Sequence, residues 1–270
     1  MDFIPDYEIA FKQISAGEGF YGAYSQAYAV TNEKLRKTMR FMPENCDNAL
    51  VVAASGDQPL FCSLYGAKHV DTFDISYNAK CIMDIKVAAL NTMGYSDYIS
   101  FLDNLFMFRL NGLRSILDIK NMKSVLYKLP KIESDYICTF KEIPLFSRGP
   151  RPRNNTSLPT LSEYNKLRQT GIRPYNCALI DIYKICGSLT KKYDFIHLSN
   201  IFDYVIENDY EELLLPIMKF VKPGGRIVME SFEEDSHFYL DFIGPKILAM
   251  SNNNFVLKKS HHMHIFERVR

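Results

Sequence analysis

The stretch Asn48-Ala49-Leu50-Val51-Val52-Ala53-Ala54, which ends in the turn Ser55-Gly56-Asp57, decides the fold class of this chain. A short apolar run that stops at turn residues is typical of a strand buried in a parallel sheet. Residues 58–65 then show helical spacing and stop at Gly66, which favours a helix C-terminus, and a second strand is expected at 69–74. The order of strand, helix and strand predicts one crossover unit of an α/β fold.

The same alternation continues towards the C-terminus. Residues 78–93 carry apolar side chains at steps of three and four, which predicts a helix that ends at Gly94. The further expected elements are strands at 177–181, 193–198 and, after a turn at 222–225, at 226–229, helices at 210–221 and 238–250, and an antiparallel pair at 255–257 and 263–266. The pattern predicts a doubly wound, mostly parallel sheet with an antiparallel C-terminal strand pair.

The chain of 270 residues is expected to form one domain, residues 1–270. Residues 1–45 are expected to form an N-terminal helical cap. Residues 95–175, first irregularly helical and then rich in Pro, Arg and Asn, are expected to be an inserted helical and loop region that holds the substrate site.

Composition limits the choice of partners and compartment. The net charge is only +1, from 32 basic and 31 acidic residues, so no nucleic-acid partner is expected. Six scattered cysteines without a CxxC pair favour a reduced, cytoplasmic protein. No signal peptide and no run of about eighteen apolar residues is seen, so no transmembrane segment is expected. Peripheral membrane contact and the oligomeric state stay open.

The residues that follow each strand are the candidates for ligand binding, because ligands of doubly wound sheets lie at the carboxyl ends of the strands. Gly56 follows the first strand, and Asp74 ends the second strand eighteen residues later, where an acid grips a ribose diol. Only one glycine of the dinucleotide-binding pattern is present, which favours S-adenosylmethionine (SAM) over NAD. A simple tight turn and a surface acid remain the alternative.

Two later strands end in polar residues as well. Asp181 is placed to accept from an adenine amino group, unless it is only a helix N-cap, and Ser199-Asn200 would face the reacting sulfonium. The predicted cofactor-binding residues are Ser55, Gly56, Asp57, Gln58, Asp74, Ile75, Ser76, Asp181, Ile182, Ser199 and Asn200.

Four segments resemble a known family. The segments are Ser55-Gly56-Asp57-Gln58-Pro59-Leu60, Gly66-Ala67-Lys68-His69-Val70, Asp74-Ile75-Ser76 and Leu198-Ser199-Asn200-Ile201-Phe202-Asp203. In this order they resemble the SAM:diacylglycerol 3-amino-3-carboxypropyltransferases of betaine-lipid synthesis and their relatives. The resemblance implies a fold of the class I SAM-dependent methyltransferase type.

The resemblance also implies a reaction. An acceptor would attack the γ-carbon of the methionine moiety, take up an aminocarboxypropyl group and release methylthioadenosine, a displacement in which positioning is most of the work. The family carries Trp-Glu-Asp after a Tyr-Ser-Gln, whereas Tyr24-Ser25-Gln26 is here followed by Ala27-Tyr28-Ala29. The acceptor is therefore left open as a small molecule, a peptide or a lipid.

Acceptor-side residues are expected in the insertion. Arg148, Arg151 and Arg153 alternate with prolines and would suit a carboxylate or phosphate, with a solvated loop as the alternative.

The candidates for the general base are Tyr24, Asp203 and His237, although Asp203 would serve equally as a helix cap and His237 as a surface residue. No metal ion is expected from the terminal histidines at 261, 262 and 264, because strand alternation puts only His262 and His264 on one face, without a third ligand near them in the sequence.

These observations lead to one prediction and two alternatives. The chain is expected to transfer the 3-amino-3-carboxypropyl group of SAM. The alternatives are a SAM-dependent methyltransferase acting on a small molecule and a non-catalytic SAM-binding protein.

Overall fold

The structure is a computed structural model. It describes residues 28–31, 33–107, 121–131, 133–135, 158–170, 176–179, 182–204, 209–230, 241, 244–251, 254–260 and 262–269. Side chains are described in these ranges except at 106–107, 170, 176–179, 182–183 and 204.

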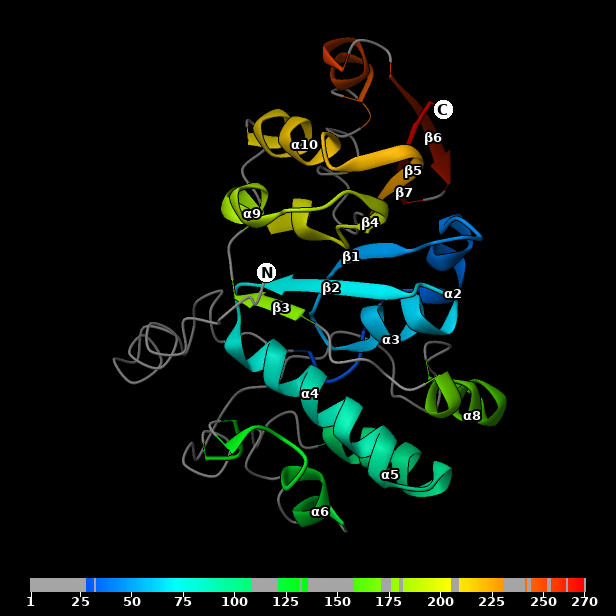
Figure 1. Ribbon diagram of the computed structural model, residues 1–270, viewed down its shortest axis with the longest axis vertical. Coiled ribbons are helices and arrows are strands. Elements are labelled where there is room, and N and C mark those ends of the chain that lie inside the picture. Colours follow the sequence, from blue (N-terminus) through cyan, green and yellow to red (C-terminus); the bar gives the residue numbers. More distant parts are fainter. Residues whose placement is uncertain are drawn as a thin grey trace.

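Seven strands form one sheet in the order β3-β2-β1-β4-β5-β7-β6. Figure 1 shows β3, β2, β1 and β4 stacked in this order from near the centre upward, with β6 at the upper right. The strands are β1 (Asn48–Val52), β2 (His69–Asp74), β3 (Asn176–Leu179), β4 (Tyr193–His197), β5 (Val221–Glu230), β6 (Phe255–Ser260) and β7 (Met263–Arg268).

The pairing of the strands confirms the predicted fold class. β1 pairs in parallel with β2 and with β4, β2 pairs in parallel with β3, and β4 with β5. β7 is antiparallel to both β5 and β6. The chain therefore winds outward from β1 in one direction and returns through β4 in the other, which creates a topological switch point between β1 and β4.

Helices cover both faces of the sheet because the buried strands are apolar on both sides. Ala49 and Val51 pack in the core that contains α3, α4, α5 and α8, whereas Leu50 and Val52 pack in the core that contains α9 and α10. The helical elements are α2 (Leu35–Thr38), η2 (Met39–Phe41), α3 (Asp57–Leu64), α4 (Tyr77–Thr92), α5 (Tyr95–Met107), α6 (Met122–Leu126), α8 (Leu161–Thr170), α9 (Ile182–Ser188), η6 (Ile201–Tyr204) and α10 (Tyr210–Met218).

The start of β5 differs from the sequence prediction. The residues expected to form a turn, 222–225, lie within β5, which begins at Val221. The register against β4 shifts between Tyr193 and Phe195, and Gly224 has a φ of +76°. Proline and glycine are unfavourable in a regular strand. The irregular pairing at the start of β5 accommodates Pro223 and the two glycines that follow it.

The two peripheral regions are described in part. Within the proposed cap, the described residues 28–31 and 33–45 contain the single-turn helices α2 and η2 and no longer helix. The described residues of the proposed insertion include the three helices α5, α6 and α8. No helix among the described residues is both long and apolar enough to cross a membrane.

Candidate functional site

The loops that follow β1, β2 and β4 meet at the carboxyl edge of the sheet, at its topological switch point. A hydrogen bond from the Ala54 backbone N–H to Asp74 Oδ2, 2.8 Å long, joins the first two loops. Ala54, Asp74, Ile75 and Asn200 are partly exposed, whereas Ser55 and Ser199 are buried. The partly exposed residues are therefore the ones of this group that solvent reaches at the edge of the sheet.

The turn after β1 depends on Gly56. Its φ of +80° lies in the left-handed region, which favours glycine. A Cβ atom at this position would lie 2.7 Å from the Cα of Met83, in α4. The close approach that requires glycine here is therefore made by α4, which packs directly onto the turn.

Asp57 is buried, and both of its carboxylate oxygens accept hydrogen bonds from other residues of the protein. Its Oδ1 accepts from Lys86 Nζ at 2.7 Å, and its Oδ2 accepts from the Thr31 N–H at 2.8 Å and from Ser55 Oγ at 2.9 Å. Burial lowers the pKa of Lys86, and the charge of Asp57 offsets only part of this effect. Asp57 therefore holds together α3, α4 and the segment that precedes α2.

Asp74 ends β2 and accepts backbone hydrogen bonds through both of its carboxylate oxygens. Besides the bond from Ala54, its Oδ1 accepts from the Ser76 N–H at 2.9 Å. Ser76 in turn caps α4, since its Oγ accepts from the Ala79 N–H. Burial raises the pKa of Asp74 to about 6, and backbone donors, among them Ser76 and Ala54, oppose the rise.

The loop after β4 contains a left-handed residue that is not glycine. Ser199 has a φ of +55°, and its carbonyl accepts from the Glu230 N–H at 2.9 Å. Its hydroxyl donates to Glu33 Oε1 and lies 3.2 Å from Asn200 Oδ1. Asp203 follows in η6, where its N–H donates to the Asn200 carbonyl.

The segment before α2 lies across this edge and ties the loops together. Glu33 Oε1 accepts a hydrogen bond from Ser199 Oγ, and Glu33 Oε2 accepts one from Gln58 Nε2 at 3.2 Å. One buried side chain thus connects the turn after β1 to the loop after β4.

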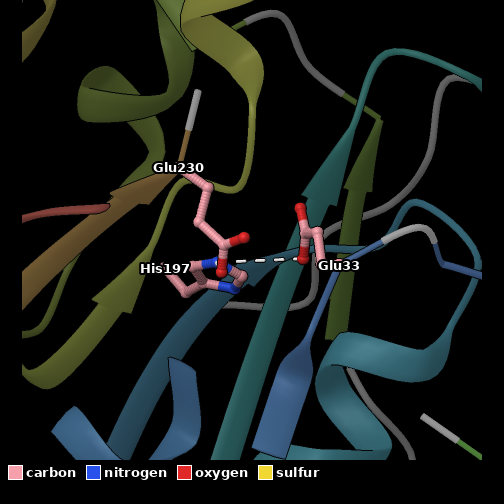
Figure 2. Close-up of side chains that lie close together, drawn as sticks. All are labelled: Glu33, His197 and Glu230. Atoms are coloured by element: carbon pink, nitrogen blue, oxygen red, sulfur yellow. Dashed lines mark ion pairs between the residues drawn. The ribbon is translucent and has the colours of Figure 1, made fainter. Parts of the chain in front are cut away.

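Two further buried residues lie beside Glu33 (Figure 2). His197 Nε2 is 3.9 Å from Glu33 Oε2 and 3.7 Å from Glu230 Oε1. Burial, followed by the charge of Glu230, raises the pKa of Glu33 to about 7. Burial alone would lower the pKa of His197, but the two neighbouring carboxylates outweigh it and raise the pKa.

The structure brings together the predicted residues Ser55, Gly56, Asp57, Gln58, Asp74, Ile75, Ser76, Ser199 and Asn200, with Asp203 next to them in the chain. Ile182 is the first residue of α9, but its side chain is not described. The remaining predictions, Tyr24, Arg148, Arg151, Arg153, Asp181 and His237, lie outside the described residues.

Sequence reasoning missed Glu33, His197 and Glu230. Glu230 ends β5, and the strand was expected to end one residue earlier, at 229. The rule that polar residues at strand ends form the site could therefore have identified Glu230. His197 lies just before the Leu198-Ser199-Asn200 motif. Glu33 has no periodicity or motif that would have marked it.

The chain is a doubly wound α/β protein whose fold is of the class I SAM-dependent methyltransferase type, with a polar site at the carboxyl edge of its parallel strands. No protein-family model and no curated protein sequence matches it.

Solved structures similar to the chain include methyltransferases. The N-methyltransferase NodS from Bradyrhizobium japonicum WM9 in complex with S-adenosyl-L-homocysteine is 10% identical, with a TM-score of 0.44 over 95% of this chain and 98% of that one. An rRNA methylase from Streptococcus thermophilus is 8% identical, with a TM-score of 0.43 over 89% of this chain and 99% of that one. Magnesium protoporphyrin IX methyltransferase from Synechocystis PCC 6803 with bound SAM is 10% identical, with a TM-score of 0.38 over 98% and 82%.

Proposed function

We propose that the chain is a SAM-dependent transferase that binds SAM at the carboxyl edge of β1, β2 and β4. The observation that carries this proposal is the placement of Asp74 at the end of β2. Each of its two carboxylate oxygens accepts one backbone N–H, from Ala54 and from Ser76. A backbone hydrogen bond from Ile75 also favours the charged form of Asp74. A carboxylate offers about four acceptor positions, so acceptor capacity remains for the hydroxyls of a ribose.

The neighbouring groups suit the rest of such a ligand. The turn after β1 and the N-terminus of the 16-residue helix α4 flank Asp74, and Ile75 offers a partly exposed apolar side chain to a nucleoside base. The partly exposed Asn200 lies across the edge, after β4, where an amide can hold the polar methionine tail.

The group transferred is proposed to be 3-amino-3-carboxypropyl. Three of the four segments that resemble the aminocarboxypropyltransferases lie at this edge: 55–60 after β1, 74–76 after β2 and 198–203 after β4. In this reaction the nucleophile of the acceptor forms a bond to the γ-carbon while the bond from that carbon to sulfur breaks. The leaving group is methylthioadenosine, and the proton of the acceptor passes to a base. Among the described residues, Asp203 is the predicted base.

The identity of the nucleoside product tests the proposal. Purified protein is incubated with SAM and a cell extract as the source of small-molecule, peptide and lipid acceptors, and the nucleosides are measured by mass spectrometry. Methylthioadenosine is expected to accumulate with the wild type and to fall at least about tenfold with Asp74→Asn, because the amide cannot accept both hydroxyls. Asp135→Asn, at an exposed Lys131 pair, is the matched control and should keep the wild-type rate.

The other results separate the alternatives. Accumulation of S-adenosylhomocysteine would mean that the methyl group is transferred from the same site. Tight SAM binding without turnover would indicate a non-catalytic SAM-binding protein. Absence of SAM binding in calorimetry with a folded protein would overturn the proposal as a whole.

A further inference from the structure

Three buried side chains from separate segments converge (Figure 2). One of them belongs to the N-terminal segment, the described residues 28–31 and 33–42. Glu33 comes from the segment before α2, His197 ends β4, and Glu230 ends β5. One nitrogen or oxygen atom of each lies within 4.8 Å of those of the other two. The three residues are 2%, 0% and 5% exposed, so the cluster belongs to the interior and not to a solvated surface.

His197 is the observation that points to a ligand. Within the described part of the chain, neither of its ring nitrogens has a hydrogen-bond partner. An imidazole that is fully buried without hydrogen bonds is costly, so a native structure needs a reason for it. Its Nε2 faces the two carboxylates at 3.9 and 3.7 Å, which is too long for hydrogen bonds.

These separations suit shared ligands of one ion. Two ligand atoms that are each bonded at about 2.1 Å to the same metal lie roughly 3 to 4 Å apart. As ligands of a metal, the two carboxylates would be ionised and the imidazole neutral, and a divalent cation would balance their two negative charges.

Other side chains hold the carboxylates in place from outside the cluster. Ser199 and Gln58 donate to the two oxygens of Glu33, and Thr38 Oγ1 donates to Glu230 Oε1. Hydrogen bonds of this kind orient the ligands of metal sites and stabilise their charged form.

We propose that Glu33, His197 and Glu230 bind a divalent first-row transition-metal ion, zinc or manganese, which fastens the N-terminal segment to β4 and β5. A ligand set of one imidazole and two carboxylates favours such an ion over calcium and magnesium, which prefer oxygen ligands alone. Among the described residues, His262 and His264 are not part of this cluster. The proposal does not depend on SAM binding, because the ion is bound by a separate set of side chains.

The test begins with the wild-type protein and the metals alone. After treatment with a chelator, the folded protein is titrated with Zn²⁺, Mn²⁺ or Mg²⁺ without SAM, and binding is followed by calorimetry. One equivalent of Zn²⁺ or Mn²⁺ is expected to bind. The Tm is expected to rise by roughly 5 °C when the metal exceeds its Kd about 100-fold. Hydrogen exchange of the amides at 28–42 should slow down when the metal is added.

Variants then locate the ion. His197→Gln and Glu230→Gln should each weaken binding by more than about 100-fold, since loss of a ligand costs at least as much as loss of a group that orients one. His264→Gln is the matched control: His264 is a buried histidine on the neighbouring strand β7, its Nε2 lies 2.6 Å from Asp241 Oδ1, and the variant should bind like the wild type. Circular dichroism confirms that each variant is folded.

Two results would overturn the proposal. If the chelator-treated wild type stays folded and neither Zn²⁺ nor Mn²⁺ binds or changes its Tm, the cluster is a group of side chains that share protons. If the metals bind equally well to the wild type, Glu230→Gln and His264→Gln, the ion is bound elsewhere. Should His197→Gln fail to fold, the wild-type titration and Glu230→Gln still decide the question.

Discussion

Lys86 Nζ lies 2.7 Å from Asp57 Oδ1, and the lysine side chain is completely removed from solvent. Lys68 Nζ lies at the same distance from Asp47 Oδ1, but these two side chains are 65% and 51% exposed. The two pairs join the same residue types at the same distance and differ in burial. Their contributions to the free energy of unfolding should therefore differ.

Lys86→Met is expected to lower the free energy of unfolding by about 3–5 kcal/mol, because it leaves the buried charge of Asp57 without its partner. Lys68→Met should lower it by less than about 1 kcal/mol, as is usual for exposed pairs. Urea unfolding of both variants measures the difference. Equal effects would show that the interaction between Lys86 and Asp57 adds nothing beyond that of an exposed pair.

Gly56→Ala is expected to destabilise the protein by roughly 2–4 kcal/mol. The new Cβ would be 2.7 Å from the Cα of Met83, and alanine would have to adopt a φ of +80°. Gly94→Ala is the control, because a Cβ at Gly94 meets no atom within 4 Å and its φ is not in the left-handed region. Thermal and urea unfolding check both values. A Gly56→Ala protein as stable as Gly94→Ala would contradict the packing of α4 on this turn.

The affinity for SAM is expected to fall as the pH drops through about 6, the raised pKa of Asp74. Ribose hydroxyls donate to the carboxylate, so SAM favours the deprotonated form and binding releases a proton below this pH. The Kd should rise about tenfold for each pH unit below 6. Calorimetry between pH 5 and 8 measures it. Asp74→Asn should bind weakly at every pH, and a pH dependence that survives in this variant would assign the effect to another group.

The same shift acts on stability. Because the pKa of Asp74 is higher in the folded protein than in the unfolded chain, its protonation favours the folded state. Its contribution to stability is fully present below about pH 4 and is lost as the pH rises through about 6. Comparison of the urea midpoints of the wild type and Asp74→Asn across this window isolates the contribution.

Arg36→Lys is expected to cost about 1–2 kcal/mol although the charge is kept. Arg36 donates to both oxygens of Glu163 in α8 and to the Leu158 carbonyl, and its guanidinium lies 5.2 Å from the Phe61 ring centroid. A lysine cannot make this planar fork. Arg40→Lys, on an exposed side chain, should leave the urea midpoint unchanged. If both variants behave alike, the fork does not hold α8 to the N-terminal segment.

The fold was largely predictable because its signals are local. The apolar run before Ser55 and the helical spacing from residue 78 depend only on which side chains must be buried, and β1, β2 and α4 lie within two residues of their predicted bounds. The start of β5 was not predictable. Pro223 and two glycines indicate a turn locally, and only the shifted register against β4 accommodates them in a strand.

In the candidate site, too, positions that follow from local sequence were predictable and long-range contacts were not. Gly56, Asp74 and Ser199 were predicted to lie at one edge because parallel strands bring their carboxyl ends together, and a position next to a strand end is enough for this prediction. Asp57 was also found, but its contacts with Lys86 and Thr31 show a structural role that no motif indicates.

The sequence by itself determined the α/β class, the order of β1, α3 and β2 along the chain and the acid that ends β2, because each follows from burial and from the periodicity of a single segment. Only the tertiary structure decided that Glu33, His197 and Glu230 meet in the interior. Glu33 is separated from His197 by 164 residues and His197 from Glu230 by 33. Contacts over such separations arise from the packing of the N-terminal segment on β4 and β5, and no local pattern encodes them.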